Sequence, residues 1–523
     1  MTHWIIAPVI LPALLAPIIA FVMRHDFTLA RAASVAGTLA LLAISIGLTI
    51  IAMGGETIAY TLGDWPAPFG IVLVLDRLSA LMVLLTSALA LVVLIHVIAT
   101  KWDEKGRHFH ALFQFQLMGI TGAFLTGDAF NLFVFFEVLL IASYGLMIHG
   151  GGRVRLQAGL QYVVMNLAGS TLFLFALGTL YASTGTLNIA DIAVKLREIP
   201  VEDAALVRVA AILLLVVFAI KAALFPIHFW LPGTYSNAPA PVAALFAIMT
   251  KVGAYAIIRI YTISFGPDLP ATEGLIAQWL MPAAVVTLAV GAVGVLGARR
   301  LMPLLSFSVV GSMGTMMLAV AAFTPYATTS ALYYLVHSTF SAAALFLLAD
   351  LVVTRRAAGD RLTAQLPTVQ NGLFAALFFA GAIGMAGMPP LSGFLGKLVI
   401  LDAIRDSNFM TLGWVAILLG SLLTIVGFAR AGSILFWKST AQVPQEDETK
   451  DEAETEAEPA PKDTPKPATA LELAPTLAAL ALLAVLAGAA GPVTQYLEGA
   501  SAQLYDSSGY ISAVLPAGQE AQQ

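Results

Sequence analysis

Long apolar stretches dominate the sequence, and short polar segments separate them at nearly regular intervals. Fourteen of these stretches are long enough to cross a bilayer as helices, which takes about 20 residues each. They lie at residues 4–23, 33–53, 72–98, 109–125, 129–148, 157–182, 206–227, 238–262, 274–297, 301–323, 328–352, 371–400, 411–436 and 470–490. The pattern predicts an all-α polytopic membrane protein with fourteen transmembrane helices.

The basic residues between the stretches support that count, because cytoplasmic loops hold an excess of Lys and Arg. Most of the 26 Lys and Arg residues lie in one set of alternate loops, which Arg24, Arg153, Arg299 and Arg355 mark. A missed or extra helix would disturb this alternation. Positive charge follows the first stretch and does not precede it, which favours a retained helix over a signal peptide. We expect both termini on the extracytoplasmic side.

Composition narrows the class of protein further. Hydrophobic residues make up 59% of the chain and charged residues only 11%, whereas soluble proteins carry roughly 25% charged residues. A water-soluble enzyme is therefore excluded. The chain has no cysteine, which excludes disulfides, thiolate metal sites and cysteine-bound iron–sulfur clusters. We expect no metal and no other cofactor. The acidic, proline-rich segment 441–468 is expected to be a disordered cytoplasmic linker.

Two apolar stretches are interrupted by proline, each beside a lysine. The seventh breaks at Leu224-Phe225-Pro226 after Lys221, and the twelfth breaks at Gly387-Met388-Pro389-Pro390 before Lys397. Paired broken helices suggest internal repeats around a site near the membrane midplane. Simple proline kinks are the alternative, and the lysine next to each break favours the site.

Five titratable residues lie inside apolar stretches: Glu137, Lys221, Lys251, His337 and Lys397. A charge at the centre of a membrane helix costs about 2.5–3.5 kcal/mol, so it tends to face a partner or a water-filled cavity. The alternatives are a packing role for the glutamate or the histidine and snorkelling to the interface for the first lysine. The pattern favours proton movement across a membrane, and we expect the glutamate and the first lysine to be in contact.

The run Lys221-Ala-Ala-Leu-Phe-Pro-Ile-His-Phe-Trp-Leu-Pro232, followed by Ser236-Asn-Ala-Pro-Ala-Pro and Thr250-Lys251-Val-Gly, resembles a known family. These are the antiporter-like subunits of respiratory complex I, membrane-bound hydrogenases and Mrp-type cation/proton antiporters. The opening of the third stretch, Phe69-Gly-Ile-Val-Leu-Val-Leu-Asp-Arg-Leu, is similar to the D subunits of the Mrp-type branch. The resemblance covers essentially all fourteen stretches.

The resemblance implies two inverted five-helix repeats, with helices 7 and 12 broken. The implied divisions are helices 1–3 (residues 1–108), a first repeat (109–265), a second repeat (266–440), the acidic linker (441–468), and helix 14 with a C-terminal tail (469–523). It also implies one proton path. In that path Glu137 pairs with Lys221, Lys251 is central, His337 follows, and Lys397 is terminal, where the middle antiporter-like subunit of complex I usually has glutamate.

The function implied by the resemblance is proton translocation within a multi-subunit Na+/H+ antiporter of the bacterial plasma membrane. The partners would be other antiporter subunits, the lipid bilayer, protons and Na+, without nucleic acid. One alternative is a proton-pumping module of a redox complex, either complex I or a hydrogenase. Another is a structural membrane subunit whose buried charges only fix helix packing. Under each reading the chain is not an enzyme with its own redox centre.

Overall fold

Side-chain caps set where several helices begin. Asp76 accepts a hydrogen bond from the backbone N–H of Ser79 and starts α3 (Arg77–Ala99). Asp128 caps α5 (Ala129–Met147) in the same way. Such a cap satisfies one of the N–H groups that a helix leaves unpaired at its start. The polar residues between the apolar stretches therefore define helix boundaries.

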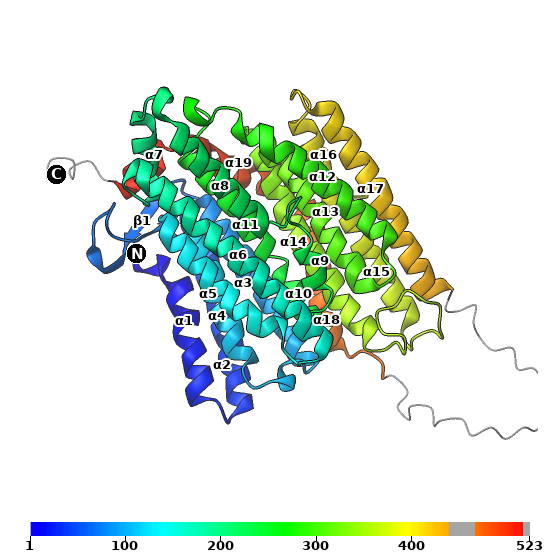
Figure 1. Ribbon diagram of the computed structural model, residues 1–523. Coiled ribbons are helices and arrows are strands. Elements are labelled where there is room, and N and C mark those ends of the chain that lie inside the picture. The colour runs from blue at the N-terminus through cyan, green and yellow to red at the C-terminus, as the bar shows by residue number, and fades with distance from the viewer. Residues whose placement is uncertain (1, 439–465, 516–523) are drawn as a thin grey trace, which may run out of the picture.

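The structure, a computed structural model that describes residues 2–438 and 466–515, is an elongated bundle of helices with roughly parallel axes (Figure 1). The first part of the bundle contains α1 (Ala7–Pro17), α2 (Phe27–Ala52), α3, α4 (Phe109–Leu125), α5, α6 (Arg153–Thr184), α8 (Ala205–Lys221), α9 (Trp230–Tyr235), α10 (Ala240–Phe246) and α11 (Met249–Ile263). The remainder contains α12 (Leu275–Gly297), α13 (Leu301–Ala322), α14 (Pro325–Val353), α15 (Asn371–Ala386), α16 (Ser392–Ala403), α17 (Met410–Gly432) and α18 (Ala470–Gly488).

The helical membrane fold is confirmed, and each predicted stretch contains a helix. Among the described residues, ten helices are long and apolar enough to cross a membrane. Shorter apolar helices cover Ala7–Val22, Phe109–Leu125 and Asn371–Ala386. The count of fourteen spans therefore stays a prediction. Most of the predicted acidic linker (441–468) lies outside the described residues.

Both predicted helix breaks are confirmed. The first separates α8 from α9, and the second separates α15 from α16. Proline has no backbone N–H and cannot continue a helix without kinking it, and Gly387 ends α15 in the left-handed conformation at φ 79°. Each break contains a cis X-Pro bond, Phe225-Pro226 and Pro389-Pro390.

The eighth predicted helix is also interrupted, which the sequence pattern did not indicate. It is divided into α10 and α11 at Ala247 and Ile248, directly before the turn that carries Lys251. Neither proline nor glycine marks this position, so the interruption has no local breaker signal. Every residue of α10 and α11 is buried. These two helices form the centre of the bundle.

The structure has further elements that the pattern of apolar stretches did not predict. An antiparallel hairpin of β1 (Ile58–Thr61) and β2 (Val72–Leu75) pairs Ile58 with Leu75, so the third predicted stretch (72–98) begins as a strand and becomes helical only at α3. A short helix, α7 (Ile189–Glu198), follows α6. The expected C-terminal tail instead forms helices through most of its described part. These helices are α19 (Ala490–Tyr505) and α20 (Ser508–Val514).

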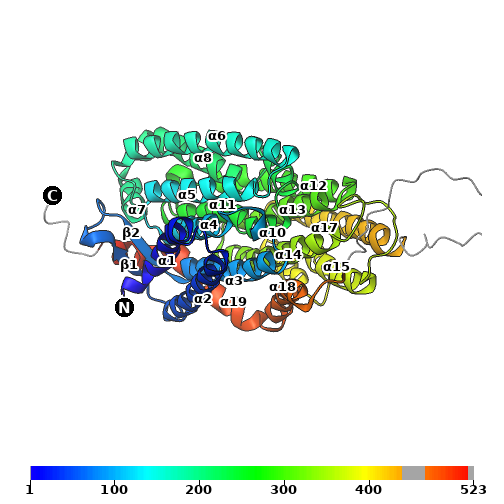
Figure 2. The same cartoon turned by 90° about the horizontal axis from the view of Figure 1, so that it is seen from below.

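The C-terminal helices pack along the bundle. Figure 2 shows α18 and α19 on the same face as α2, beside α3 and α14, and contacts join both helices to α3 and α14. The hydroxyl of Tyr496 in α19 donates to the carbonyl of Arg77 at 2.8 Å. The C-terminal part of the chain thus braces the start of α3 against the second half of the bundle.

Candidate functional site

The five candidate residues lie on five helices that follow one another along the bundle. Figure 2 shows α5, α8, α11 and α14 in this order from the end near α7 towards α15 and α17, and α16 packs against α14. These helices carry Glu137, Lys221, Lys251, His337 and Lys397, respectively. The candidates therefore form a series across the bundle and do not form one compact cluster.

Glu137 and Lys221 are linked through α6, not to each other. Glu137 Oε1 accepts a hydrogen bond from the Ser170 hydroxyl, and Lys221 Nζ donates to Asn166 Oδ1 at 3.2 Å. Asn166 and Ser170 are four residues apart, so they lie on the same face of α6. The expected direct contact between the glutamate and the lysine is wrong for this structure, since no ion pair joins these two described residues.

The position of the Lys221 side chain is fixed on several sides. Asn166 Nδ2 donates to the carbonyl of Tyr162 at 2.9 Å, which orients its oxygen towards the lysine. The Nζ atom also lies 5.8 Å from the ring centroid of Phe136, within the range of a cation–π contact. Lys221 is only 6% exposed. The side chain does not snorkel, because it turns inward to α6.

The Ile220 carbonyl at the first break accepts its hydrogen bonds from groups other than the lysine. Trp230 Nε1 donates to the carbonyl of Ile220 at 2.9 Å. The tryptophan of the family-like run therefore stabilises the C-terminal end of α8 and leaves the lysine free to reach α6.

Lys251 is fully buried, and its Nζ has no hydrogen-bond partner within the described chain. A buried polar group without a partner is costly, and such groups inside membrane proteins mark ion and proton pathways. Gly253 allows α11 to approach the end of α8 closely. A Cβ atom at Gly253 would lie 2.6 Å from the backbone nitrogen of Ala222. The absence of a side chain there brings the turn with Lys251 against the turn with Lys221.

His337 connects α14 to the second broken helix. Its Nδ1 is 2.9 Å from the Ser392 hydroxyl, which belongs to the first turn of α16. A Cβ atom at Gly393 would lie 2.7 Å from His337 Nε2, so this glycine allows α16 to pack directly on the imidazole. His337 is 1% exposed.

The ammonium group of Lys397 donates a hydrogen bond to a backbone carbonyl at the end of α15, beside the second break. Its Nζ donates to the carbonyl of Ala386 and to the Ser421 hydroxyl, both at 2.8 Å. A small cavity beside it is lined by hydroxyl-bearing side chains from three helices. These are Ser308, Ser312, Thr315, Tyr334 and Thr424. Hydroxyl groups from three helices therefore lie beside Lys397.

Two buried pairs of ionisable side chains lie outside the candidate set and were not predicted from the sequence. Arg259 of α11 forms a bidentate ion pair with Asp76, with Nη2 2.8 Å from Oδ1. His96 and Asp350 form a second buried pair, with 3.0 Å between Nε2 and Oδ2. Both could have been found as lone charges inside or beside apolar stretches. Their partners are distant in sequence and could not.

An ion pair also ties loops together outside the membrane helices. Burial alone would raise the pKa of Asp103, but hydrogen bonds from Arg31 and His110 outweigh it and hold that pKa below its ordinary value. Arg31 Nη2 lies 2.9 Å from Asp103 Oδ1. This pair fixes the start of α2 to the loop before α4.

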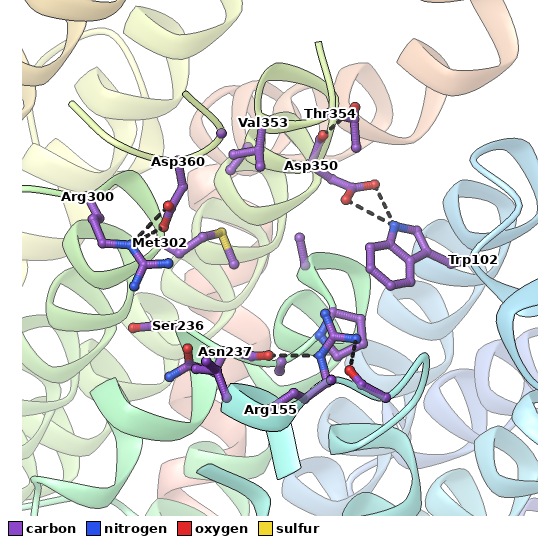
Figure 3. Close-up of a pocket in the computed structure, with 18 of the residues that line it drawn as sticks. Trp102, Arg155, Ser236, Asn237, Arg300, Met302, Asp350, Val353, Thr354 and Asp360 are labelled. Carbon is purple, nitrogen blue, oxygen red and sulfur yellow. Dashed lines mark hydrogen bonds and ion pairs between the residues drawn. The ribbon is translucent and has the colours of Figure 1, made fainter. Parts of the chain in front are cut away.

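An open cavity of about 580 Å³ lies where loops from both halves of the bundle meet. Its lining includes Trp102, Arg155, Arg300, Asp350 and Asp360. In Figure 3 the Trp102 indole points at Asp350 on one side, and Arg300 pairs with Asp360 on the other. These loops belong to the basic set predicted to be cytoplasmic.

Comparisons with known proteins agree with the helical architecture. A family model described as NADH:quinone oxidoreductase/Mrp antiporter, TM matches residues 126–424. A chain in the structure of the Mrp complex from Dietzia sp. superposes with a TM-score of 0.85 and 29% identity. The match covers 98% of this chain and 100% of that chain.

Two relatives match most of the chain. The D subunit of a probable K+/H+ antiporter from Rhizobium meliloti is 40% identical over 471 residues, covering 84% of this chain and 87% of the relative. The D subunit of a Na+/H+ antiporter from Bacillus subtilis is 36% identical over 520 residues, covering 98% of this chain and 100% of the relative. The chain therefore belongs to the NADH:quinone oxidoreductase/Mrp antiporter transmembrane family, together with the D subunits of cation/proton antiporters.

Proposed function

We propose that this chain is the proton-translocating subunit of a multi-subunit monovalent cation/proton antiporter in a bacterial plasma membrane. The relatives are named for K+ and for Na+, so the proposal specifies a monovalent cation without choosing between them. One observation carries the proposal: titratable side chains recur on successive helices along the bundle, and the central one, Lys251, is buried without a hydrogen-bond partner in the described chain.

The first step of the proposed path runs along α6. Glu137 and Lys221 each bond to one polar residue of the same helical face, Ser170 and Asn166. A hydroxyl and an amide one turn apart place the two charged groups on a common polar strip. A change in the charge of either group is felt by the other through this strip, since opposite charges stabilise each other.

The central step is transfer between Lys221 and Lys251. The close packing of Gly253 on Ala222 brings the two turns together. The amine of Lys251 is free to take a proton from the first half and to pass it towards His337. An imidazole has two ring nitrogens, so it can take up a proton at one and release a proton from the other, which suits it to a relay position.

The last step ends at Lys397. Ser392 bonds to His337 and lies in the same short helix, α16, as Lys397. The hydroxyl-lined cavity beside Lys397 provides polar groups that accept and donate hydrogen bonds. Residues 109–265 and 266–440 are proposed as the two inverted repeats, so that the path crosses from one repeat to the other between Lys251 and His337.

The proposed topology places the acidic linker in the cytoplasm and both termini outside. The chain has no cysteine, so a single cysteine introduced at Glu452 or at Ser507 is the only thiol of the chain that can be labelled. Its labelling shows on which side of the membrane that position lies. We expect membrane-impermeant maleimide to label the two positions from opposite faces. Labelling of both positions from the outer face would contradict the fourteen-helix arrangement.

Cation-driven proton movement is the direct test of the proposed function. The assembled complex should move protons in everted vesicles when Na+ or K+ is added, and it should purify without flavin or iron–sulfur subunits. Purification with such subunits, together with proton movement driven only by a redox substrate, would favour a redox complex instead. A redox complex is the alternative because the description of the matching family model includes NADH:quinone oxidoreductase.

A further inference from the structure

Tyr334 of α14 is a buried residue that contacts both ends of the last step of the proposed path. It is 1% exposed, and its ring centroid lies 5.6 Å from that of His337. A Cβ atom at Gly396, the residue before Lys397, would lie 2.9 Å from Tyr334 Cδ2. The ring therefore packs against the imidazole on one side and against the turn of α16 that carries Lys397 on another.

The hydroxyl group of Tyr334 belongs to the small cavity beside Lys397. Tyr334 and Lys397 both line this cavity, and the Tyr334 hydroxyl interacts with the side chain of Thr315, another lining residue. Lys397 Nζ donates to the Ala386 carbonyl and to the Ser421 hydroxyl. An ammonium group has three N–H donors, so a charged Lys397 has one left for a group in the cavity.

The other four hydroxyl groups of the cavity lie on α13 and α17, and their protons are engaged within their own helices. Each donates to a backbone carbonyl: Ser308 to Leu305, Ser312 to Val309, Thr315 to Gly311, and Thr424 to Gly420. No backbone carbonyl of the described residues accepts the Tyr334 hydroxyl. Tyr334 is therefore the hydroxyl of this cavity whose proton is free to be passed on.

The cavity has room for about one water molecule. Its volume is about 10 Å³, near the least that admits a water. A buried water also needs about two to four polar partners, and Tyr334, Thr315 and Lys397 provide them. A water in this place bridges the Tyr334 hydroxyl and Lys397 Nζ.

We propose that the Tyr334 hydroxyl is a relay group that passes protons between His337 and Lys397 through one water in this cavity. The inference rests on the proposed function and names a residue for its last step. Tyr334 Oη accepts a proton from protonated His337 as its own proton moves to the water, and the water gives a proton to neutral Lys397. The phenol and the water are restored, His337 has lost one proton and Lys397 has gained one. The return transfer uses the same atoms.

The test is the rate of cation-driven proton movement by the assembled complex in everted vesicles, normalised to assembled protein. Tyr334→Phe keeps the ring that packs on His337 and removes only the hydroxyl. We expect the rate to fall about tenfold or more, with assembly as in the wild type. The ratio of the rates in H2O and D2O should rise above the wild-type ratio, because the interrupted proton transfer then limits transport.

The matched control is Tyr333→Phe, which removes the hydroxyl at the next position of the same helix. That hydroxyl donates to the Leu486 carbonyl at 3.0 Å and does not line the cavity, so this variant should keep the wild-type rate and ratio. Equal rate losses in the two variants would make the Tyr334 hydroxyl a structural group and overturn the proposal. A slow Tyr334→Phe with the wild-type ratio would overturn it as well.

A second variant covers the case in which Tyr334→Phe assembles poorly. Thr315→Val removes the hydroxyl with which Tyr334 interacts, and a raised ratio of the rates in H2O and D2O is then required of it. A wild-type ratio in that variant overturns the proposal.

The failure of this inference is distinguishable from failure of the proposed function. A wild-type rate in Tyr334→Phe, alongside loss of transport in Lys251→Met, would overturn only the relay. Absence of cation-driven proton movement by the unmodified complex would overturn both.

Discussion

Lys221 donates a hydrogen bond to Asn166 Oδ1 at 3.2 Å, although Glu137 is the carboxylate that its sequence context suggests as a partner. The glutamate is instead bonded to Ser170, one turn further along the same helix. Two charged groups from α5 and α8 are therefore coordinated by one face of α6. Under the proposed function, this arrangement would keep the two charges coupled without a direct contact between them.

The polar face of α6 is expected to be essential for transport. Asn166→Leu removes the hydrogen-bond partner of a buried ammonium at similar volume, and hydrogen bonds to charged groups are worth about 1.5–3 kcal/mol. We expect the rate of cation-driven proton movement to fall about tenfold or more, and Ser170→Ala to act in the same direction. Thr171→Ala is the control, since its exposed hydroxyl bonds only within α6. Equal rates in Ser170→Ala and Thr171→Ala would remove α6 from the path.

Close packing at Gly253 is expected to hold the turn of α11 that carries Lys251 against the turn of α8 that carries Lys221. Gly253→Ala would place a Cβ atom 2.6 Å from the Ala222 nitrogen, so the backbone must move apart. We expect loss of transport at reduced but measurable assembly. Gly178→Ala has no atom within 4 Å of the added carbon and should stay neutral or stabilise α6 slightly. Full activity in Gly253→Ala would show that this separation is not critical.

Lys397 is expected to require a donor group at its position. A glutamate there cannot donate to the Ala386 carbonyl as the ammonium does, and it stabilises the opposite charge state. Lys397→Glu should assemble, because its pocket is lined with hydroxyl groups, but its transport rate and pH profile should both change. Arg405→Gln, an exposed change near the end of α16, serves as control. An unchanged rate and profile would exclude Lys397 from the path.

The loop ion pair of Asp103 predicts how stability depends on pH. Its folded-state pKa is lowered, so its contribution is complete above the ordinary carboxyl value near 4 and disappears as the pH falls through the folded-state pKa. Asp103→Asn should lower the apparent Tm of the purified protein at pH 7 by about 2 °C or more. The difference from the wild type should shrink below about pH 4. A difference that stays constant down to pH 3 would contradict the charge-based explanation.

The helical stretches, the two proline breaks and the five lone charges could all be identified from the sequence, because each depends on local chemistry. Pro226 and Pro390 lack the backbone N–H that continues a helix, and Lys251 is a lone charge in an apolar run. The interruption at Ala247 has no such local signal. It depends on the packing of α10 and α11 at the centre of the bundle.

The partners of the buried charges could not be identified in the same way. Lys221 and Asn166 are 55 positions apart, and Asp76 and Arg259 are 183 positions apart. A lone charge is costly to insert into a membrane, so a buried charge is expected to have a partner. Only the packing of the helices determines which residue that partner is. The nearest opposite charge in the predicted path, Glu137, was therefore the wrong direct partner for Lys221.

Cation-driven proton movement by Lys251→Met reports whether protons cross the bundle through Lys251. The assay uses everted vesicles, with the rate normalised to assembled complex. Lys195→Met, a change of a surface lysine paired with Asp191, is measured in parallel and should match the wild type. We predict that Lys251→Met assembles and moves no protons above background. Transport by that variant at a near wild-type rate would contradict the proposed path.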